Sequence, residues 1–116
     1  MQSTVAIDQL REFLGLMVFD SANEPVGSVK EVLYEEATNW PLWIGVGAAP
    51  SATSRILLPL ESALIGGAGL TFPFTKDFMR RAPVVRGDFG GAQKQELRVY
   101  YGLSPREPSG ETRWLT

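Results

Sequence analysis

Acidic side chains around the first predicted turn are the strongest chemical signal in this chain. The carboxylates of this stretch are Asp20, Glu24, Glu31, Glu35 and Glu36. Paired carboxylates can bind a cation or transfer protons. Polar side chains are also typical of turns, and a calcium site needs about six or more oxygen ligands. We therefore expect a solvated acidic surface and predict no metal site.

A second charged group lies further along the chain and is basic. Its members are Lys76, Arg80, Arg81 and Arg86. Such a cluster could contact the phosphates of RNA. Arg80 and Arg81 also fall where positive charge stabilises the C-terminal end of a predicted helix, and the neighbouring Asp77 and Asp88 dilute the field. We expect a solvated patch and keep RNA contact around Arg80 as the alternative.

The composition removes the usual catalytic groups. The 116 residues include no histidine and no cysteine, so the commonest general base, the thiolate nucleophile and the commonest transition-metal ligands are missing. A conventional serine triad is excluded. The run Gly66-Gly67-Ala68-Gly69 lacks the Lys and Ser/Thr of a phosphate loop. We predict that the chain is not an enzyme and that it uses no cofactor and no small-molecule substrate.

Four aromatic residues are candidates for a protein interface. They are Trp40, Trp43, Tyr100 and Tyr101. Tryptophan and tyrosine are enriched at protein–protein contacts, although burial in the domain's own core explains them equally well. Both interpretations stay open for these residues.

Trp43 carries a specific expectation. If Ile44 points into the interior, strand alternation turns Trp43 outward, beside Gly45, which has no side chain. A ring of this size is unfavourable in water. We expect it to be covered by the C-terminal helix, through Leu97 and Tyr101, or by a second copy of the chain.

The elements that position these residues follow from hydrophobic periodicity and turn signals. Helical spacing predicts a short helix near residues 7–14. Residues 16–34 predict a hairpin, and further short strands are expected at 42–47, 55–60 and 70–72. Helices are predicted at 75–81, with Thr75 as N-cap, and at 92–101, with Gly102 as the left-handed residue after its end.

The hairpin also predicts a bulge. Val29 and Val32 are three residues apart, which breaks strict alternation if both are interior. Gly27 lies just before them, where a missing side chain permits a bulge or a close approach of two backbones.

Short strands at regular spacing followed by helices predict a mainly β fold, a small barrel of about five to six short strands with short C-terminal helices. We expect a lead-in at 1–13, a barrel domain at 14–103 and a flexible tail at 104–116. The net charge of −2 and the 44% hydrophobic content are ordinary for a soluble domain. No signal peptide or membrane span is predicted, and we expect a cytoplasmic location.

The order and spacing of several short motifs resemble those of the PRC-barrel domain family. The motifs are Leu14-Gly15, Val18-Phe19-Asp20, Val26-Gly27-Ser28-Val29, Trp43-Ile44-Gly45-Val46, Leu58-Pro59-Leu60, Phe74-Thr75-Lys76-Asp77, Ala82-Pro83 and Glu96-Leu97-Arg98-Val99-Tyr100-Tyr101-Gly102. The last three resemble actinobacterial-type members. The resemblance covers residues 10 to 103.

The resemblance implies a β-barrel that serves as an adaptor or assembly module and shares no catalytic residues. The family includes the cytoplasmic domain of the photosynthetic reaction-centre H subunit and the C-terminal domain of a ribosome maturation factor. The 116 residues contain no counterpart of the membrane helix of the first or of the N-terminal domain of the second, so we expect neither specific function here. We expect a protein partner, with a homodimer as one form, and keep an RNA- or ribosome-associated role as the alternative.

Overall fold

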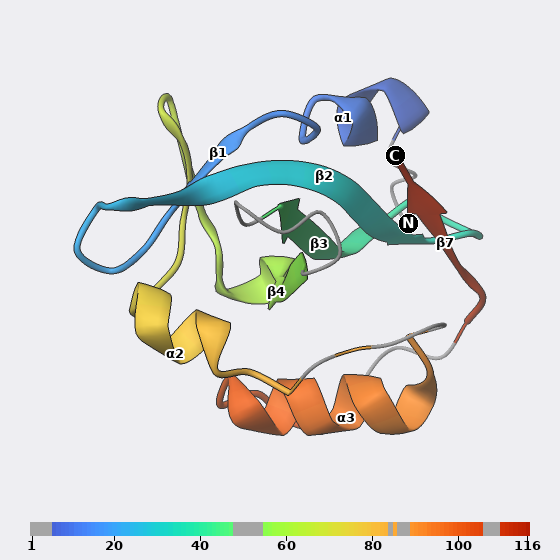
Figure 1. Cartoon of the computed structure of the whole chain (residues 1–116). Coiled ribbons are helices and arrows are strands. Elements are labelled where there is room, and N and C mark those ends of the chain that lie inside the picture. The colour runs from blue at the N-terminus through green and yellow to red at the C-terminus, as the bar shows by residue number, and fades with distance from the viewer. Residues whose placement is uncertain (1–5, 48–54, 84, 86–88, 106–109) are drawn as a thin grey trace.

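The chain folds as one curled β-sheet with short helices packed around it (Figure 1). The computed structural model describes residues 6–47, 55–83, 85, 89–105 and 110–116. In chain order the elements are α1 (Ile7–Arg11), β1 (Met17–Phe19), β2 (Pro25–Glu35), β3 (Pro41–Gly47), β4 (Arg55–Pro59), the 3₁₀ helix η1 (Leu60–Ser62), β5 (Leu64–Gly66), β6 (Gly69–Thr71), α2 (Lys76–Arg80), α3 (Gly91–Tyr100) and β7 (Thr112–Leu115).

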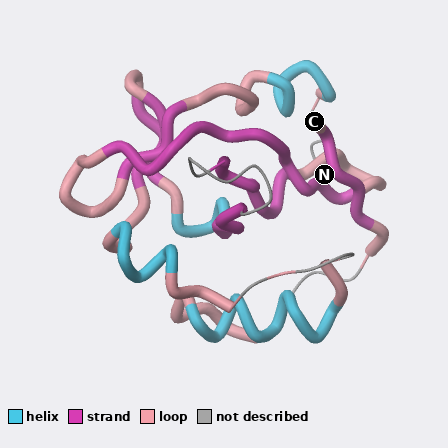
Figure 2. Tube along the Cα trace, in the orientation of Figure 1, coloured by secondary structure: helices cyan, strands magenta, loops and turns pink. Residues whose placement is uncertain are grey.

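The strand order along the sheet is β4-β3-β2-β1-β6-β5, and β7 pairs with β2 beside this path. β1 and β6 are parallel, whereas the other pairs are antiparallel. β4 and β5 lie at the two ends of this order, and their described residues do not pair with each other. The described strands therefore form a half-barrel and not a closed barrel. Figure 2 shows this curl, with α1 on one side of β2 and α2 and α3 on the other. The predicted mainly β architecture with short helices is confirmed.

β2 is the longest strand, and two irregularities bend it. Opposite β1, Val18 pairs with Gly27 and Phe19 with Pro25, which leaves Val26 as the extra residue. Opposite β3, the pairs on either side of Lys30 leave that residue without a partner. The second bulge allows Val29 and Val32 to be buried together, although they are three residues apart. The predicted bulge is therefore confirmed.

Gly27 is needed because two backbones approach closely there. Its φ is not positive, so left-handed strain plays no part. A Cβ built on Gly27 would collide with the carbonyl oxygen of Gly47 and would lie 3.0 Å from Cγ1 of Val46. The requirement at this position is thus steric and comes from β3.

The helix ends agree with the sequence signals. The hydroxyl of Thr75 accepts a hydrogen bond from the Phe78 N–H at 3.1 Å, which caps α2. Gly102 follows α3 with φ +78°. The N–H of Leu103 donates to the carbonyl of Arg98 at 2.8 Å, as expected after a left-handed residue. Both helix predictions are confirmed.

The secondary structure differs from the predictions in two places. Leu64–Gly66, which carried no strand prediction, forms β5 and pairs with β6. The predicted tail at 104–116 contains β7, whose Trp114 pairs with Leu33 of β2. β7 pairs with the end of β2, on the edge whose start pairs with β1, and it carries the apolar residues Trp114 and Leu115. This segment therefore belongs to the folded domain. The composition-based expectation of a flexible tail is wrong for residues 112–115.

We predict that Gly27→Val destabilises the protein by about 1–3 kcal/mol, because the new side chain must displace the β3 backbone. Gly66→Val is the matched control. No atom lies within 4 Å of a Cβ at Gly66, so the control should change stability by less than about 0.5 kcal/mol. Urea unfolding of both variants measures the difference. Equal midpoints for Gly27→Val and wild type would contradict the close approach.

Candidate functional site

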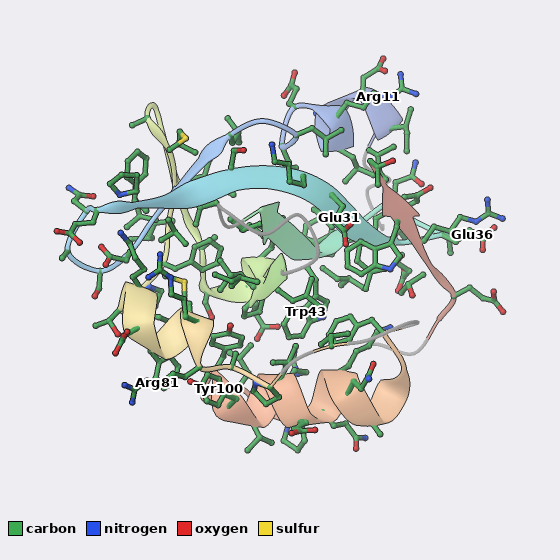
Figure 3. The ribbon with its side chains drawn as sticks, in the orientation of Figure 1. Arg11, Glu31, Glu36, Trp43, Arg81 and Tyr100 are labelled. Atoms are coloured by element: carbon green, nitrogen blue, oxygen red, sulfur yellow. The ribbon has the colours of Figure 1, made fainter. Side chains whose placement is uncertain are left out.

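Trp43 is a core residue and offers no surface to another molecule. It is 1% exposed, and Figure 3 shows it between the sheet and α3. Phe89 covers it, with ring centroids 5.1 Å apart in an edge-to-face arrangement. The covering group thus comes from the chain itself, and it includes Phe89 of the segment before α3. The prediction of Trp43 as an interface residue is wrong, because both faces of β3 are buried along Trp43–Val46. Of the two expected covers, the chain itself provides it.

The other three aromatic candidates have different environments. Tyr101 is 4% exposed, whereas Tyr100 is half-buried. Trp40, which precedes β3, is 54% exposed. Of the four aromatic candidates, Trp40 therefore presents the largest uncovered ring.

Trp40 lines an apolar groove of about 650 Å³. The walls come from α1, the start of β3, η1, β5 and α3. The lining residues are Gln9, Glu12, Phe13, Leu16, Trp40, Pro41, Leu42, Leu60, Glu61, Ile65 and Arg98. Most of them are apolar, and Trp40 and Ile65 are 54% and 70% exposed. This composition suits the burial of apolar side chains from a binding partner.

One wall of the groove contains an ion pair. Nη1 of Arg98 lies 3.2 Å from Oε1 of Glu61. The Arg98 side chain is 8% exposed, whereas that of Glu61 is 59% exposed. Nε of Arg98 also donates to the carbonyl of Ser104. Arg98 is therefore fixed in the wall, and the carboxylate of Glu61 is held at the rim.

The predicted basic patch is not one continuous surface. Nζ of Lys76 lies 4.0 Å from Glu24 in the β1–β2 turn. Arg81 pairs with Asp77 at 3.3 Å and points away from the protein in Figure 3. Arg80 is exposed, and Arg86 lies outside the described residues. The structure thus draws Lys76 to the hairpin and leaves Arg80 and Arg81 on α2.

Beside these arginines, two aromatic rings stack at the surface. The rings of Phe78 and Tyr100 are 4.4 Å apart with an interplanar angle of 20°. The Tyr100 hydroxyl donates to the carbonyl of Phe78 at 2.5 Å. This bond and the stacked rings attach α2 to the last turn of α3.

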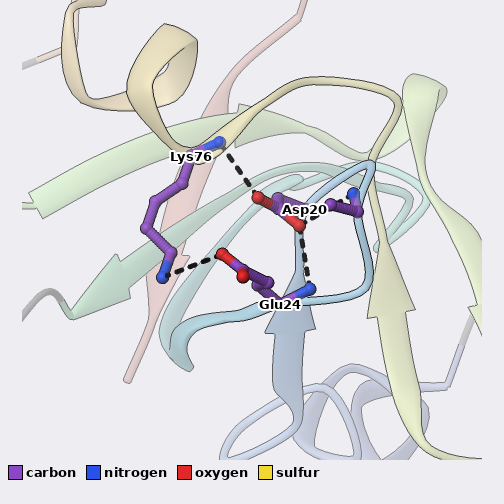
Figure 4. A network of polar contacts seen from close by, with 4 residues as sticks. Asp20, Glu24 and Lys76 are labelled. Carbon is purple, nitrogen blue, oxygen red and sulfur yellow. Dashed lines mark hydrogen bonds and ion pairs between the residues drawn. The ribbon is translucent and has the colours of Figure 1, made fainter.

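Asp20 was expected on a solvated surface, but the structure buries it at 4% exposure. Oδ1 accepts hydrogen bonds from the N–H groups of Ala22 (2.9 Å) and Glu24 (2.8 Å), and Oδ2 accepts from that of Lys76 (3.3 Å) (Figure 4). The hydrogen bond from Glu24 is the main cause that lowers the pKa of Asp20, against an opposing effect of burial.

These contacts give Asp20 a structural role. Its carboxylate joins the β1–β2 turn to the start of α2, which lies more than fifty residues further along the chain. Among the described residues, no three acidic side chains gather in a way that could hold a metal ion.

Tyr101 packs among the same aromatic residues without using its hydroxyl. Its ring centroid lies 4.8 Å from that of Phe74 and 5.3 Å from that of Tyr100. The phenolic oxygen is buried and has no hydrogen-bond partner among the described residues. Burial raises the pKa of Tyr101. Tyr101 is thus a core residue, and the prediction that it lies at an interface is wrong.

Sequence reasoning missed most of the groove. Glu12, Glu61 and Ile65 carried no functional prediction, and Arg98 was noted only within the closing-helix motif. The Arg98–Glu61 pair joins residues 37 positions apart. A charged residue within the apolar pattern of an amphipathic helix was a usable signal for Arg98.

Together these features define a small β-barrel domain with an apolar surface groove. The model of the PRC-barrel domain family matches residues 7–79, from α1 into α2. The match covers more than half of the chain, and the chain belongs to the PRC-barrel domain family. Every groove residue except Arg98 lies within the match. No curated protein sequence matches the chain. No helix in the described part of the chain has the length and apolar character needed to cross a membrane.

We predict that Asp20→Asn lowers Tm at neutral pH, because an amide nitrogen replaces one acceptor oxygen and faces a backbone N–H. The pKa of Asp20 is lowered by folding, so its contribution is present above the unfolded value of about 3.9 and is lost as pH falls through the folded value. The Tm difference between wild type and variant should therefore shrink in acid. A difference that stays constant from neutral pH to strong acid would contradict this role.

Tyr101→Phe and Tyr100→Phe should change stability in opposite directions. The first removes a buried hydroxyl without a partner and should raise the free energy of unfolding by about 1 kcal/mol. The second removes the hydrogen bond to Phe78 and should lower it by about 0.5–1.5 kcal/mol. Chemical denaturation of the matched pair measures both. A clear loss of stability in Tyr101→Phe would show that the hydroxyl has a partner.

Proposed function

We propose that this PRC-barrel domain is a non-enzymatic adaptor that binds protein through the apolar groove and that it self-associates. The observation that carries the proposal is Trp40, which is 54% exposed within a predominantly apolar surface. An aromatic side chain buries roughly 150–250 Å² when it is covered. Contact with another protein would recover the free energy lost while this area is in water.

The composition of the groove supports a protein partner. Exposed aromatic and aliphatic side chains at the centre of a surface, with charged groups at the rim, are typical of protein–protein contacts. Trp40 and Ile65 provide the first feature, and Glu12 and Glu61 the second. The location that fits this role is the cytoplasm.

Two observations support a role without catalysis. The chain has no histidine and no cysteine. The buried carboxylate, Asp20, accepts three backbone hydrogen bonds, which occupy both of its oxygens. An RNA-associated role has less support, because the predicted basic cluster is not one continuous surface: Lys76 lies beside Glu24 of the hairpin, whereas Arg80 and Arg81 lie at the end of α2.

Sedimentation of wild type and Trp40→Ala over a wide range of concentrations tests the proposal. We expect wild type to form a concentration-dependent oligomer and Trp40→Ala to shift it toward a folded monomer. Because Trp40 is half-exposed, its loss should change Tm little. Met17→Ala is the control, since Met17 is 39% exposed and does not line the groove.

The adaptor proposal fails if loss of Trp40 from the groove changes neither self-association nor the binding of other proteins. That outcome requires a wild type that stays monomeric at high concentration. It also requires immobilised wild type and Trp40→Ala to retain the same proteins from native cells.

A further inference from the structure

The groove and the stacked aromatic pair lie on opposite flanks of the last turn of α3. Successive residues of an α-helix are rotated by roughly 100° about its axis. Arg98 lines the groove, whereas Tyr100 stacks on Phe78 of α2. Val99 lies between them and is 60% exposed. An exposed apolar residue therefore separates the two surfaces.

The surface on the α2 side, which we name the basic aromatic patch, consists of Phe78, Arg80, Arg81 and Tyr100. Phe78 is 36% exposed and both arginines are exposed. Asp77, Arg80 and Arg81 are all exposed, and Asp77 pairs with Arg81. The solvent side of α2 therefore carries two guanidinium groups against one carboxylate beside Phe78. It combines aromatic area with an excess of positive charge.

The groove has the complementary character. Its lining includes the carboxylates of Glu12 and Glu61 against the single guanidinium of Arg98. Within the described part of the chain, Glu12 forms no ion pair. Trp40 adds an exposed ring, which can receive a guanidinium over its face.

We propose that the groove is filled by the basic aromatic patch of a second copy of this chain, in a two-fold dimer whose axis passes near Val99. The inference rests on the proposed function and specifies the two surfaces that meet. Arg80 and Arg81 of one copy would lie toward Glu12, Glu61 and Trp40 of the other. The exposed edge of Phe78 would lie against the apolar lining of the groove.

The positions of the two surfaces favour a closed dimer. In a two-fold contact the same surface of both subunits takes part, so each groove must meet the patch of the other copy. The groove and the patch lie on either side of Val99. A two-fold axis through Val99 therefore places the patch of the second copy over the groove of the first, and the reverse. Each charge contact then occurs twice, which doubles its effect on the dimer.

A charge exchange between the two surfaces tests the dimer. Glu12→Lys places like charge in the groove, and Arg81→Glu places like charge in the patch. Each variant alone should self-associate on the order of tenfold more weakly than wild type. An equimolar mixture of the two variants, one of them fluorescently labelled, should form a heterodimer of near wild-type affinity, because both contacts again join opposite charges. Sedimentation and Tm are measured for every sample.

Matched controls are Glu111→Lys and Lys30→Glu, which make the same charge changes at exposed positions outside both surfaces. Both should associate as wild type does. Arg81 is 78% exposed in its side chain and Glu12 is exposed, so the variants should keep the wild-type Tm.

The alternative outcomes separate this inference from the proposed function. If wild type self-associates through Trp40 but Glu12→Lys and Arg81→Glu associate equally well, the groove–patch contact is wrong and the adaptor role stands. A mixture that fails to form the heterodimer also overturns the contact. If wild type stays monomeric while Trp40 is needed for another protein to bind, the second copy is excluded as the occupant.

Discussion

The backbone hydrogen bonding of β2 positions the rest of this domain. Its first part pairs with β1 and its last part with β7, on the same edge, while β3 pairs along the other edge. A regular strand of this length would place Val29 and Val32 on opposite faces. The bulge at Lys30 instead lets both enter the core. The close approach of Gly27 to Gly47 fixes where β3 can lie.

The second constraint is the cover over the other face of β3. Phe89 packs edge-on against Trp43, and Trp114 of β7 lies next to Phe89, with ring centroids 6.5 Å apart. These three residues come from distant parts of the chain, and together they exclude water from the side of the sheet that faces α3. The segments after the barrel strands therefore belong to the same core as the strands.

The groove arises at the junction of five elements, each of which is held in place by the sheet or the core. α1 contributes Gln9, and Glu12 follows directly after it. The turn before β3 contributes Trp40, and β5 contributes Ile65. The Arg98–Glu61 pair joins α3 to η1 at one wall. The apolar lining stays open to solvent between these walls, as the 54% exposure of Trp40 and the 70% exposure of Ile65 show.

Local patterns in the amino-acid chain were enough to predict the hairpin, the bulge before Val32, the Thr75 cap and the Gly102 helix end. The order and spacing of its motifs indicated the family. The four structural features depend on residues close together in the chain, whose propensities and spacing act locally. The burial of Trp43 and Asp20, the pairing of β7 and the assembly of the groove depend instead on contacts between distant segments. Trp43 shows the physical reason. The alternation of side chains along β3 places Trp43 and Ile44 on opposite faces of the strand. It does not tell whether the face of Trp43 meets water. That depends on Phe89, which lies more than forty residues further along the chain and covers the Trp43 ring. Asp20 is similar, because a polar residue in a turn is expected to face solvent until the start of α2 supplies the N–H group that buries it.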